Sequence, residues 1–164
     1  MKRVCRTTML GAIMFAGLLF SGVARAQTDS LQNSELVQRQ IQPLLDEMML
    51  AANAHDTNRF LATYLHQPAL VFVFNGVVTK GWDNVQALQL KWWNNGKSDV
   101  TYSQRAPSEF TVLSPVVAVV TNPMASRRTL PGGEVSTGEF TVTMVWQKRA
   151  EGWRIVQVHE STVH

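Results

Sequence analysis

The stretch from Gly138 to Ser161 constrains the fold most, because it has the pattern of two strands joined by a tight turn. Apolar and polar side chains alternate along its first half, where the apolar ones are Phe140, Val142, Met144 and Trp146. A period of two is typical of a strand buried on one face. Gly152 can adopt the positive φ of a turn, and the segment from Trp153 is rich in β-branched and aromatic residues. The sequence therefore predicts a β-hairpin here.

Residues 1–26 have the pattern of a signal peptide. A basic segment comes first, then the apolar run Met9–Phe20, then Ala24-Arg25-Ala26 with the A-x-A spacing of a cleavage site; the basic residues are Lys2, Arg3 and Arg6. The apolar run is too short for a stop-transfer helix. We expect cleavage after Ala26, a mature domain over 27–164, a periplasmic or secreted location and no membrane attachment after cleavage. The alternative is an N-terminal anchor that stays attached.

Removal of this segment changes the charge of the chain. Four of the 15 lysines and arginines lie in it, so the mature chain has 11 against 12 acidic residues, a net charge near −1. A nucleic-acid binder needs a basic stripe, and the remaining basic doublets are Arg127-Arg128 and Lys148-Arg149. We therefore expect no nucleic-acid partner.

The sequence gives no sign of a metal site or a cofactor. Cys5, the one cysteine, precedes the cleavage site, so the mature chain has no thiol and no disulfide. The four histidines lack metal-ligand spacing, and neither a dinucleotide fingerprint nor a phosphate loop occurs. We expect neither a metal nor a cofactor.

The first half of the mature chain predicts three helices. Apolar residues recur at helical spacing from Val37 to Ala52. Asn33 or Ser34 is expected to cap this helix, and Pro43 to kink or divide it. Asp56 is expected to cap a short second helix, and a third follows over 82–93.

Strand patterns fill the rest of the chain. Leu70–Asn75 is apolar on both faces, Asn75-Gly76 is a turn signal and Val77–Thr79 returns; further strands are expected over Val100–Arg105, Glu109–Leu113 and Val116–Arg128. Short connections between consecutive strands predict an antiparallel, strongly curved sheet. Helices followed by strands indicate the α+β class.

The order of these elements resembles the nuclear transport factor 2-like (NTF2-like) superfamily, and within it the SnoaL-like domain proteins. The matching positions are Asp56, Phe60, Leu61, Tyr64, Val71–Gly76, Gly81-Trp82, Gly138, Phe140-Thr141, Trp146, Gly152–Val156, His159 and Ser161. The resemblance implies a cone-shaped, cystatin-like α+β domain, in which three N-terminal helices pack on the concave side of a strongly curved antiparallel sheet. This fold hosts isomerases, cyclases, dehydratases, assembly domains and binders, so it does not assign a function.

Strict alternation along the last strand puts Ile155, His159 and Ser161 on one face. The resemblance implies that this face points into the cone. The expected pocket residues are Tyr64, Phe72, Phe74, Trp82, Trp93, Trp146, Ile155 and Ser161. An apolar cavity with few polar groups is how small-molecule sites are built. The alternative is that these aromatic side chains fill the core.

His159 is the candidate catalytic residue, because an imidazole titrates near neutral pH and can act as a general acid or base. The alternative is a structural histidine. Alternation places Glu160 and Glu139 on the other, outer face. Ketosteroid isomerase chemistry needs a carboxylate beside the substrate and a tyrosine in the oxyanion hole. The chain has two tyrosines, Tyr64 and Tyr102, and no acid that alternation places inside.

Three functions follow as expectations. The first is an exported protein that binds a small apolar molecule in an aromatic-lined pocket. The second is an enzyme of the isomerase, dehydratase or cyclase type with His159 as acid or base, and the third is a structural or assembly module. We also expect a homodimer through the outer face of the last hairpin, whose residues there are Thr141, Thr143, Val145, Val156 and Val158.

Overall fold

A computed structural model describes residues 17–162 of the chain, with side chains from residue 31 onward. The chain divides into two units, 1–33 and 34–164. In the first unit the described residues, 17–33, are helical. The predicted basic segment of the signal peptide, Cys5 and the start of the apolar run lie outside the described residues. Within residues 17–162 no helix has both the length and the hydropathy to cross a membrane.

The long helix α1 runs from Gly17 to Asn53. It passes through Asn33 and Ser34 without interruption, so the predicted N-cap at that point is wrong. Pro43 lies inside the helix and does not divide it. A proline removes one backbone hydrogen bond. The apolar face of the second unit's part of α1 contains Ile41 and Leu45, both buried, and this packing holds the helix on either side of Pro43.

Two short helical elements and a third helix follow. The helix α2 covers Thr57–Phe60 and continues into a 3₁₀ turn, η1, over Leu61–Thr63; α3 covers Trp82–Trp92. Asp56 caps α2 as predicted, because its carboxylate accepts a hydrogen bond of 3.1 Å from the Arg59 backbone amide.

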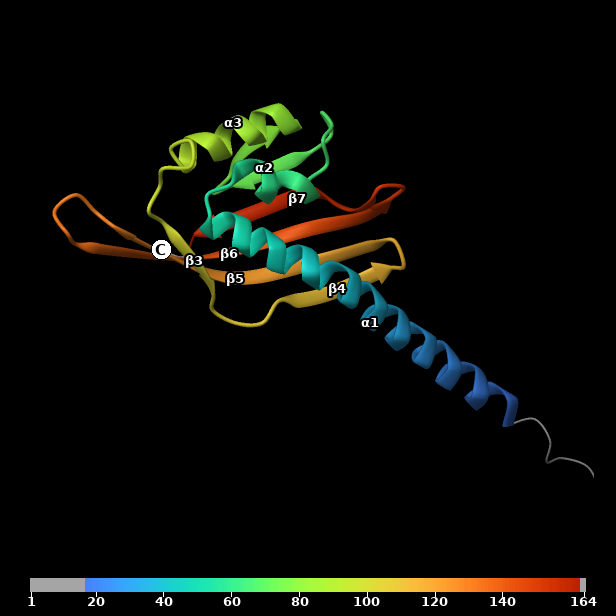
Figure 1. Cartoon of the computed structure of the whole chain (residues 1–164). Coiled ribbons are helices and arrows are strands. Elements are labelled where there is room, and N and C mark those ends of the chain that lie inside the picture. The colour runs from blue at the N-terminus through green and yellow to red at the C-terminus, as the bar shows by residue number, and fades with distance from the viewer. Residues whose placement is uncertain (1–16, 163–164) are drawn as a thin grey trace, which may run out of the picture. The chain divides into compact units, whose positions relative to one another are not determined.

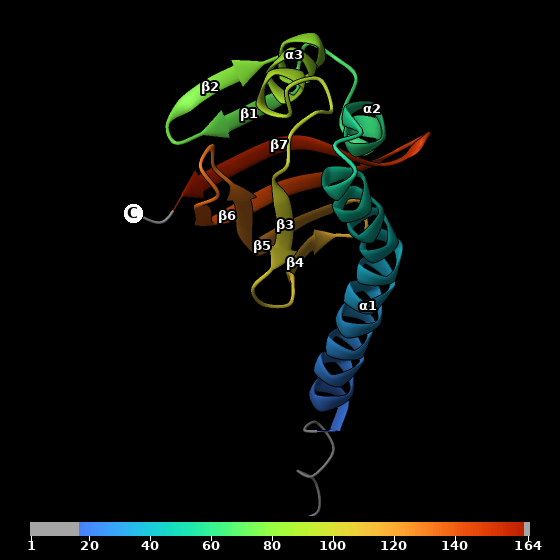
Figure 2. The same cartoon turned by 60° about the vertical axis from the view of Figure 1, so that its left-hand side comes forward.

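Seven strands form one sheet in the order β2-β1-β7-β6-β5-β3, and β4 also pairs with β5. The strands are β1 Val71–Phe74, β2 Val77–Lys80, β3 Thr101–Gln104, β4 Glu109–Ser114, β5 Val117–Thr129, β6 Val135–Arg149 and β7 Gly152–Thr162. Figures 1 and 2 show the sheet curling below α2 and α3. Within residues 34–162 this is an α+β cone, as predicted.

The pairing of β1 with β7 is parallel, so the prediction of a wholly antiparallel sheet is wrong at this position. The argument from short connections holds for consecutive strands such as β5, β6 and β7, which pair antiparallel. It does not apply to β1 and β7, because most of the domain lies between them in the sequence. The sheet is therefore mixed.

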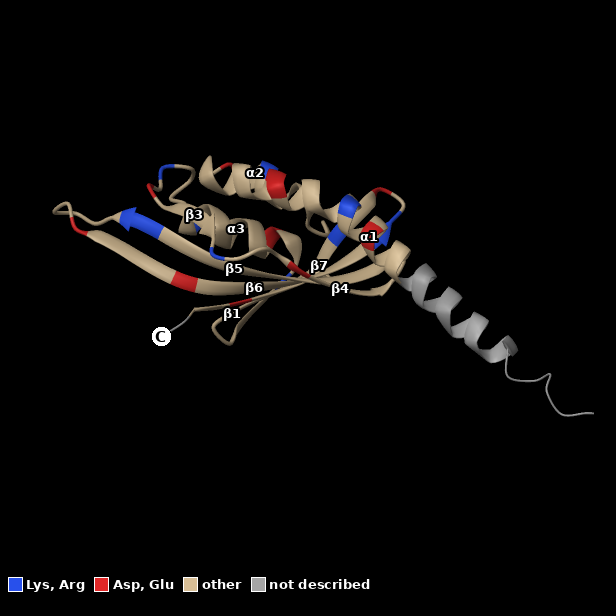
Figure 3. Ribbon diagram, turned by 90° about the horizontal axis from the view of Figure 1, so that it is seen from below, with Lys and Arg blue, Asp and Glu red and all other residues tan. Residues whose placement is uncertain are grey.

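Charged residues lie mainly on the helices and at the ends of strands (Figure 3). Arg127 and Arg128 occupy the end of β5, and Arg105 forms a 2.8 Å ion pair with Glu139 of β6. Glu139 is exposed, as expected from its position in the alternation. The middle of the sheet is almost free of charge, which leaves its concave face to apolar packing.

A β-bulge in β7 changes the face that its side chains occupy. Val145 pairs with Gln157, but the next residue, Trp146, pairs with Ile155, so Val156 is an extra residue in β7. Each residue after the bulge consequently lies on the face opposite to the one that strict alternation predicts. Val158, predicted for the outer face, is fully buried.

Candidate functional site

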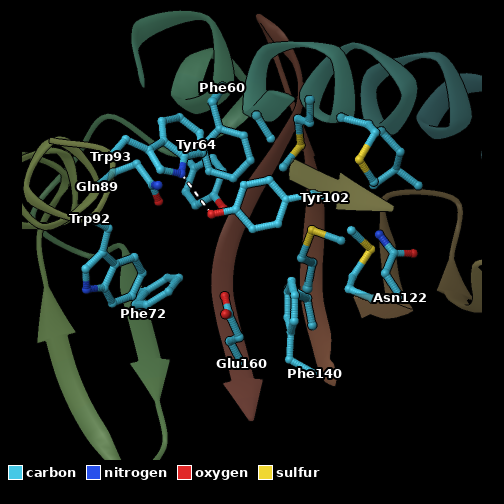
Figure 4. Close-up of a pocket in the computed structure, with 17 residues that line it drawn as sticks. Phe60, Tyr64, Phe72, Gln89, Trp92, Trp93, Tyr102, Asn122, Phe140 and Glu160 are labelled. Atoms are coloured by element: carbon cyan, nitrogen blue, oxygen red, sulfur yellow. Dashed lines mark hydrogen bonds between the residues drawn. The ribbon is translucent and has the colours of Figure 1, made fainter. Parts of the chain in front are cut away.

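The concave face of the sheet and the helices enclose an apolar cavity of about 110 Å³, the inner cavity (Figure 4). It is lined by Leu45, Met48, Met49, Ala52, Phe60, Tyr64, Phe72, Gln89, Trp92, Trp93, Tyr102, Asn122, Met124, Phe140, Val142, Met144 and Glu160. Most of the lining residues are methionines and aromatic residues; the aromatic rings offer a large apolar area, and the methionine side chains adapt to the shape of a ligand. The inner cavity thus has the composition of a small-molecule site.

A larger hollow of about 440 Å³, the outer groove, adjoins the inner cavity. Trp92, Tyr102, Phe140 and Glu160 line both spaces. The outer groove is more polar, since serine and threonine side chains and Arg128 also line it. The shared residues make the outer groove the mouth of the inner cavity.

Trp93 organises the aromatic wall. It caps the end of α3, is buried, and packs edge to face against Phe60 with ring centroids 5.0 Å apart. Its Nε1 donates a hydrogen bond of 2.9 Å to the Tyr102 hydroxyl oxygen. The wall is therefore fixed both by packing and by a directed hydrogen bond.

A second aromatic group lies where the inner cavity meets the outer groove. Trp92 packs against Phe72 and Phe74, with ring centroids 5.7 Å and 5.1 Å apart. Phe72 lines the inner cavity and Phe74 the outer groove. Because Trp92 is partly exposed, this group borders the opening.

Glu160 is the carboxyl group of the site. It follows the bulge on β7, lines both spaces, and forms no ion pair with any described residue. Burial raises the pKa of its carboxyl to about 7, because the ionised form is poorly solvated there. A carboxyl group with this pKa can either accept or donate a proton near neutral pH.

Glu160 also affects the two tyrosines of the cavity. Burial raises the pKa of Tyr64, and the nearby Glu160 charge raises it further. Burial likewise raises the pKa of Tyr102, while the hydrogen bond from Trp93 acts in the opposite direction. Both phenols therefore stay protonated near neutral pH and can serve as hydrogen-bond donors.

Five of the eight predicted pocket residues do not line the inner cavity. Trp146 and Ile155 are fully buried in the core, and Trp82 packs against His66 with ring centroids 4.3 Å apart. Ser161 is exposed, and Phe74 lines the outer groove instead of the inner cavity. Tyr64, Phe72 and Trp93 do line the inner cavity.

The predicted position of His159 is wrong. It is exposed and lines neither space, because the bulge at Val156 turns it to the outer face. The same shift turns Glu160 inward, so the expectation from alternation that no acidic residue faces the cavity is also wrong. The adjacent apolar pair Ile155-Val156, which interrupts the alternation, is the signal in the sequence that could have located the bulge.

Two polar residues of the inner cavity were missed. Gln89 of α3 and Asn122 of β5 are both buried and line it. The Asn122 side-chain oxygen, Oδ1, is buried and has no hydrogen-bond partner among the described residues. A lone polar residue in a strand gives no sign in the sequence of which face it occupies until the register is known.

The model of the SnoaL-like domain family matches residues 41–164. This range includes every residue that lines the inner cavity. No curated protein matches the chain significantly.

Solved structures share the fold. An NTF2-like superfamily protein from Salmonella enterica is 21% identical with a TM-score of 0.68, over 79% of this chain and 93% of that one. A ketosteroid isomerase-like protein from Erwinia carotovora atroseptica is 20% identical with a TM-score of 0.62, over 77% and 95%. A protein with a cystatin-like fold from Caulobacter vibrioides is 19% identical with a TM-score of 0.64, over 77% and 89%. At these identities the likeness establishes the fold alone.

Proposed function

The chain belongs to the SnoaL-like domain family, and from this premise we propose that its inner cavity binds a small, largely apolar molecule. The observation that carries the proposal is an apolar cavity with the carboxyl group of Glu160 at its mouth, which forms no ion pair within the described part of the chain. Apolar walls supply affinity, and a few polar groups fix the orientation of the ligand.

A second candidate function is an enzyme of the isomerase or dehydratase type, with Glu160 as the general acid or base. The pKa of Glu160, which burial raises to about 7, favours it, because proton transfer is most effective when the pKa of the catalytic group lies near the working pH. Phenolic donors at Tyr64 and Tyr102 are available to hold a ligand oxygen. A purely structural module is the third candidate, and the open cavity gives it no support.

Titration of the purified chain with 2-naphthol tests the binding function. Trp92 and Trp93 line the inner cavity, so binding should change tryptophan fluorescence. Val142→Phe fills the cavity and should weaken binding at least about tenfold, a cost of about 1.4 kcal/mol. Thr143→Phe adds the same ring to the outer face one residue away and serves as the matched control.

Saturable binding that Val142→Phe weakens and Thr143→Phe preserves would support the proposal. Absence of binding, or equal binding by both variants, would contradict it. Native mass spectrometry of the protein from its own cell then identifies a resident ligand. Turnover of that ligand, abolished in Glu160→Gln with binding retained, would distinguish an enzyme from a binder.

We also propose a homodimer through the outer face of the sheet. Thr141, Thr143 and Val145 remain on that face and are half-buried, whereas the burial of Val158 removes it from the predicted set. Sedimentation at micromolar concentration measures the mass directly. A dimer supports the proposal, and a monomer contradicts it.

A further inference from the structure

The strands β5, β6 and β7 contribute two polar side chains to the inner cavity. These two residues are Asn122 on β5 and Glu160 on β7. The other cavity-lining residues of these three strands are apolar: Met124, Phe140, Val142 and Met144. The two polar groups are therefore isolated on an otherwise apolar surface.

The register places the two polar residues in one row across the sheet. Asn122 pairs with Val142, and Val142 pairs with Glu160. Neighbouring strands lie about 4.8 Å apart, so the backbones of Asn122 and Glu160 are about 10 Å apart, with Val142 between them. Figure 4 shows the two side chains on different strands of the cavity lining.

Among the described residues that line the inner cavity, Asn122 has a buried side-chain atom without a hydrogen-bond partner. The residue is 8% exposed, and its Oδ1 atom is buried without a hydrogen-bond partner among the described residues. Buried polar atoms in native proteins are almost always hydrogen-bonded. Asparagine is also unfavourable in the interior of a strand, so neither packing nor strand propensity accounts for its presence. Asn122 lines the cavity, and a half-turn of its amide about the Cβ–Cγ bond would present this oxygen to a donor on a ligand.

Glu160 provides the second contact at the other end of the row. It lines the opening shared with the outer groove and forms no ion pair among the described residues. Its carboxyl group can hydrogen-bond to a ligand hydroxyl. Val142, between the two, presents only methyl groups to the ligand.

We propose that the cavity selects an elongated, apolar molecule with a hydrogen-bonding group at each end, a donor bound by Asn122 and a hydroxyl bound by Glu160. This inference rests on the proposed binding function and names its ligand class. The row of Asn122, Val142 and Glu160 matches such a molecule in order, polar, apolar, polar. A ligand with one polar end leaves the Asn122 oxygen unpaired.

Two related probes test this selection. Naphthalene-2,6-diol carries equivalent hydroxyl groups at opposite ends of a flat ring system, and 2-naphthol carries one. The wild-type chain should bind the diol at least about tenfold more tightly, because a site with unpaired buried polar groups rejects the ligand that cannot pair them. Both affinities are measured by tryptophan fluorescence.

Asn122→Val removes the polar group at the β5 end of the row, and valine is a favourable residue in a strand. The variant should bind 2-naphthol at least as tightly as the wild type and lose the preference for the diol. Thr121→Val is the matched control, since Thr121 is the preceding residue on β5 and does not line the cavity. This control should keep the full preference.

The outcomes separate the two proposals. Equal affinity of the wild type for the two probes would overturn the two-ended selection while the binding function stands. A preference that persists in Asn122→Val would also overturn it. If neither probe binds, both proposals fail. The wild-type comparison needs no variant, so the test does not depend on the folding of Asn122→Val.

Discussion

Trp93 donates a hydrogen bond from Nε1 to the Tyr102 hydroxyl oxygen at 2.9 Å, and this contact joins the end of α3 to β3. Trp93 is 1% exposed, so its N–H group has no access to bulk water. The bond also sets the position of the Tyr102 ring in the lining shared by the inner cavity and the outer groove. Stability and site geometry are coupled at this pair.

Tyr102→Phe should lower the free energy of unfolding by about 1–3 kcal/mol, the cost of leaving a buried donor unpaired. Thr101→Val is the control, because the Thr101 hydroxyl group donates to the Arg127 carbonyl at an exposed position. It should change stability by less than about 0.5 kcal/mol. Urea denaturation measures both variants. Equal stability of Tyr102→Phe and the wild type would show that the bond contributes nothing.

Glu160→Gln should change the pH dependence of stability. Burial raises the pKa of the Glu160 carboxyl from 4.5 to about 7 in the folded state. The folded state holds this proton more tightly than the unfolded chain. The contribution of Glu160 to the free energy of unfolding is therefore complete below about pH 4.5 and is lost as the pH rises to about 7. Glutamine does not titrate, so the free energy of unfolding of the variant should rise relative to that of the wild type by on the order of 1–3 kcal/mol between pH 4 and pH 8.

Urea denaturation across this pH range tests the Glu160 prediction. Glu134→Gln is the control, because Glu134 is exposed in the loop between β5 and β6. The free energy of unfolding of Glu134→Gln should differ from that of the wild type by the same amount at each pH. A Glu160→Gln curve parallel to that of the wild type would mean that the Glu160 carboxyl group is well solvated in the folded protein.

His159→Ala should have little effect on the site. His159 is exposed and lines neither space, so the variant should keep the affinity for 2-naphthol and change stability by less than about 0.5 kcal/mol. Fluorescence titration and urea denaturation measure the two quantities. A loss of 2-naphthol binding without a loss of stability would show that His159 contributes to the site and would contradict this prediction.

Export and cleavage after Ala26 remain predictions from the sequence. Expression of the full chain in an exporting bacterium should yield a periplasmic or secreted product whose N-terminal residue is Gln27. Ala26→Arg disrupts the A-x-A pattern and should leave the chain unprocessed. Intact mass spectrometry reads both results, and an unprocessed wild-type chain would contradict the signal peptide.

Local signals in the sequence were sufficient for much of the fold. Gly152 has φ of 107° in the turn predicted there, and Asn75 and Gly76 have φ of 45° and 84°, as a tight turn requires. Asp56 caps α2 with its own side chain. In each case the determining interaction lies within a few residues, so the sequence contains it directly.

The candidate site depends on features that are not local. The Asn122 side chain faces the cavity because of the register between β5 and β6, and Glu160 faces it because of one extra residue in β7. An alternating pattern specifies two faces but carries no information about a shift between them. Tyr64, Phe72 and Trp93 of the aromatic wall were predicted from their apolar segments, whereas Trp82 and Trp146 were predicted for the pocket and do not line it.

The extra residue at Val156 makes the chemistry of the cavity depend on the register of β7 as well as on residue type. His159 and Glu160 are neighbours, and the bulge decides which of them faces the cavity, because it places His159 opposite Thr143 and Glu160 opposite Val142. Without the bulge, and with Val156 kept in the ladder, His159 would lie opposite Val142 and would replace Glu160 on the concave face. A relative whose last strand has the same length but no bulge would thus present the preceding residue to its pocket, and an alignment without a gap would superimpose residues from opposite faces.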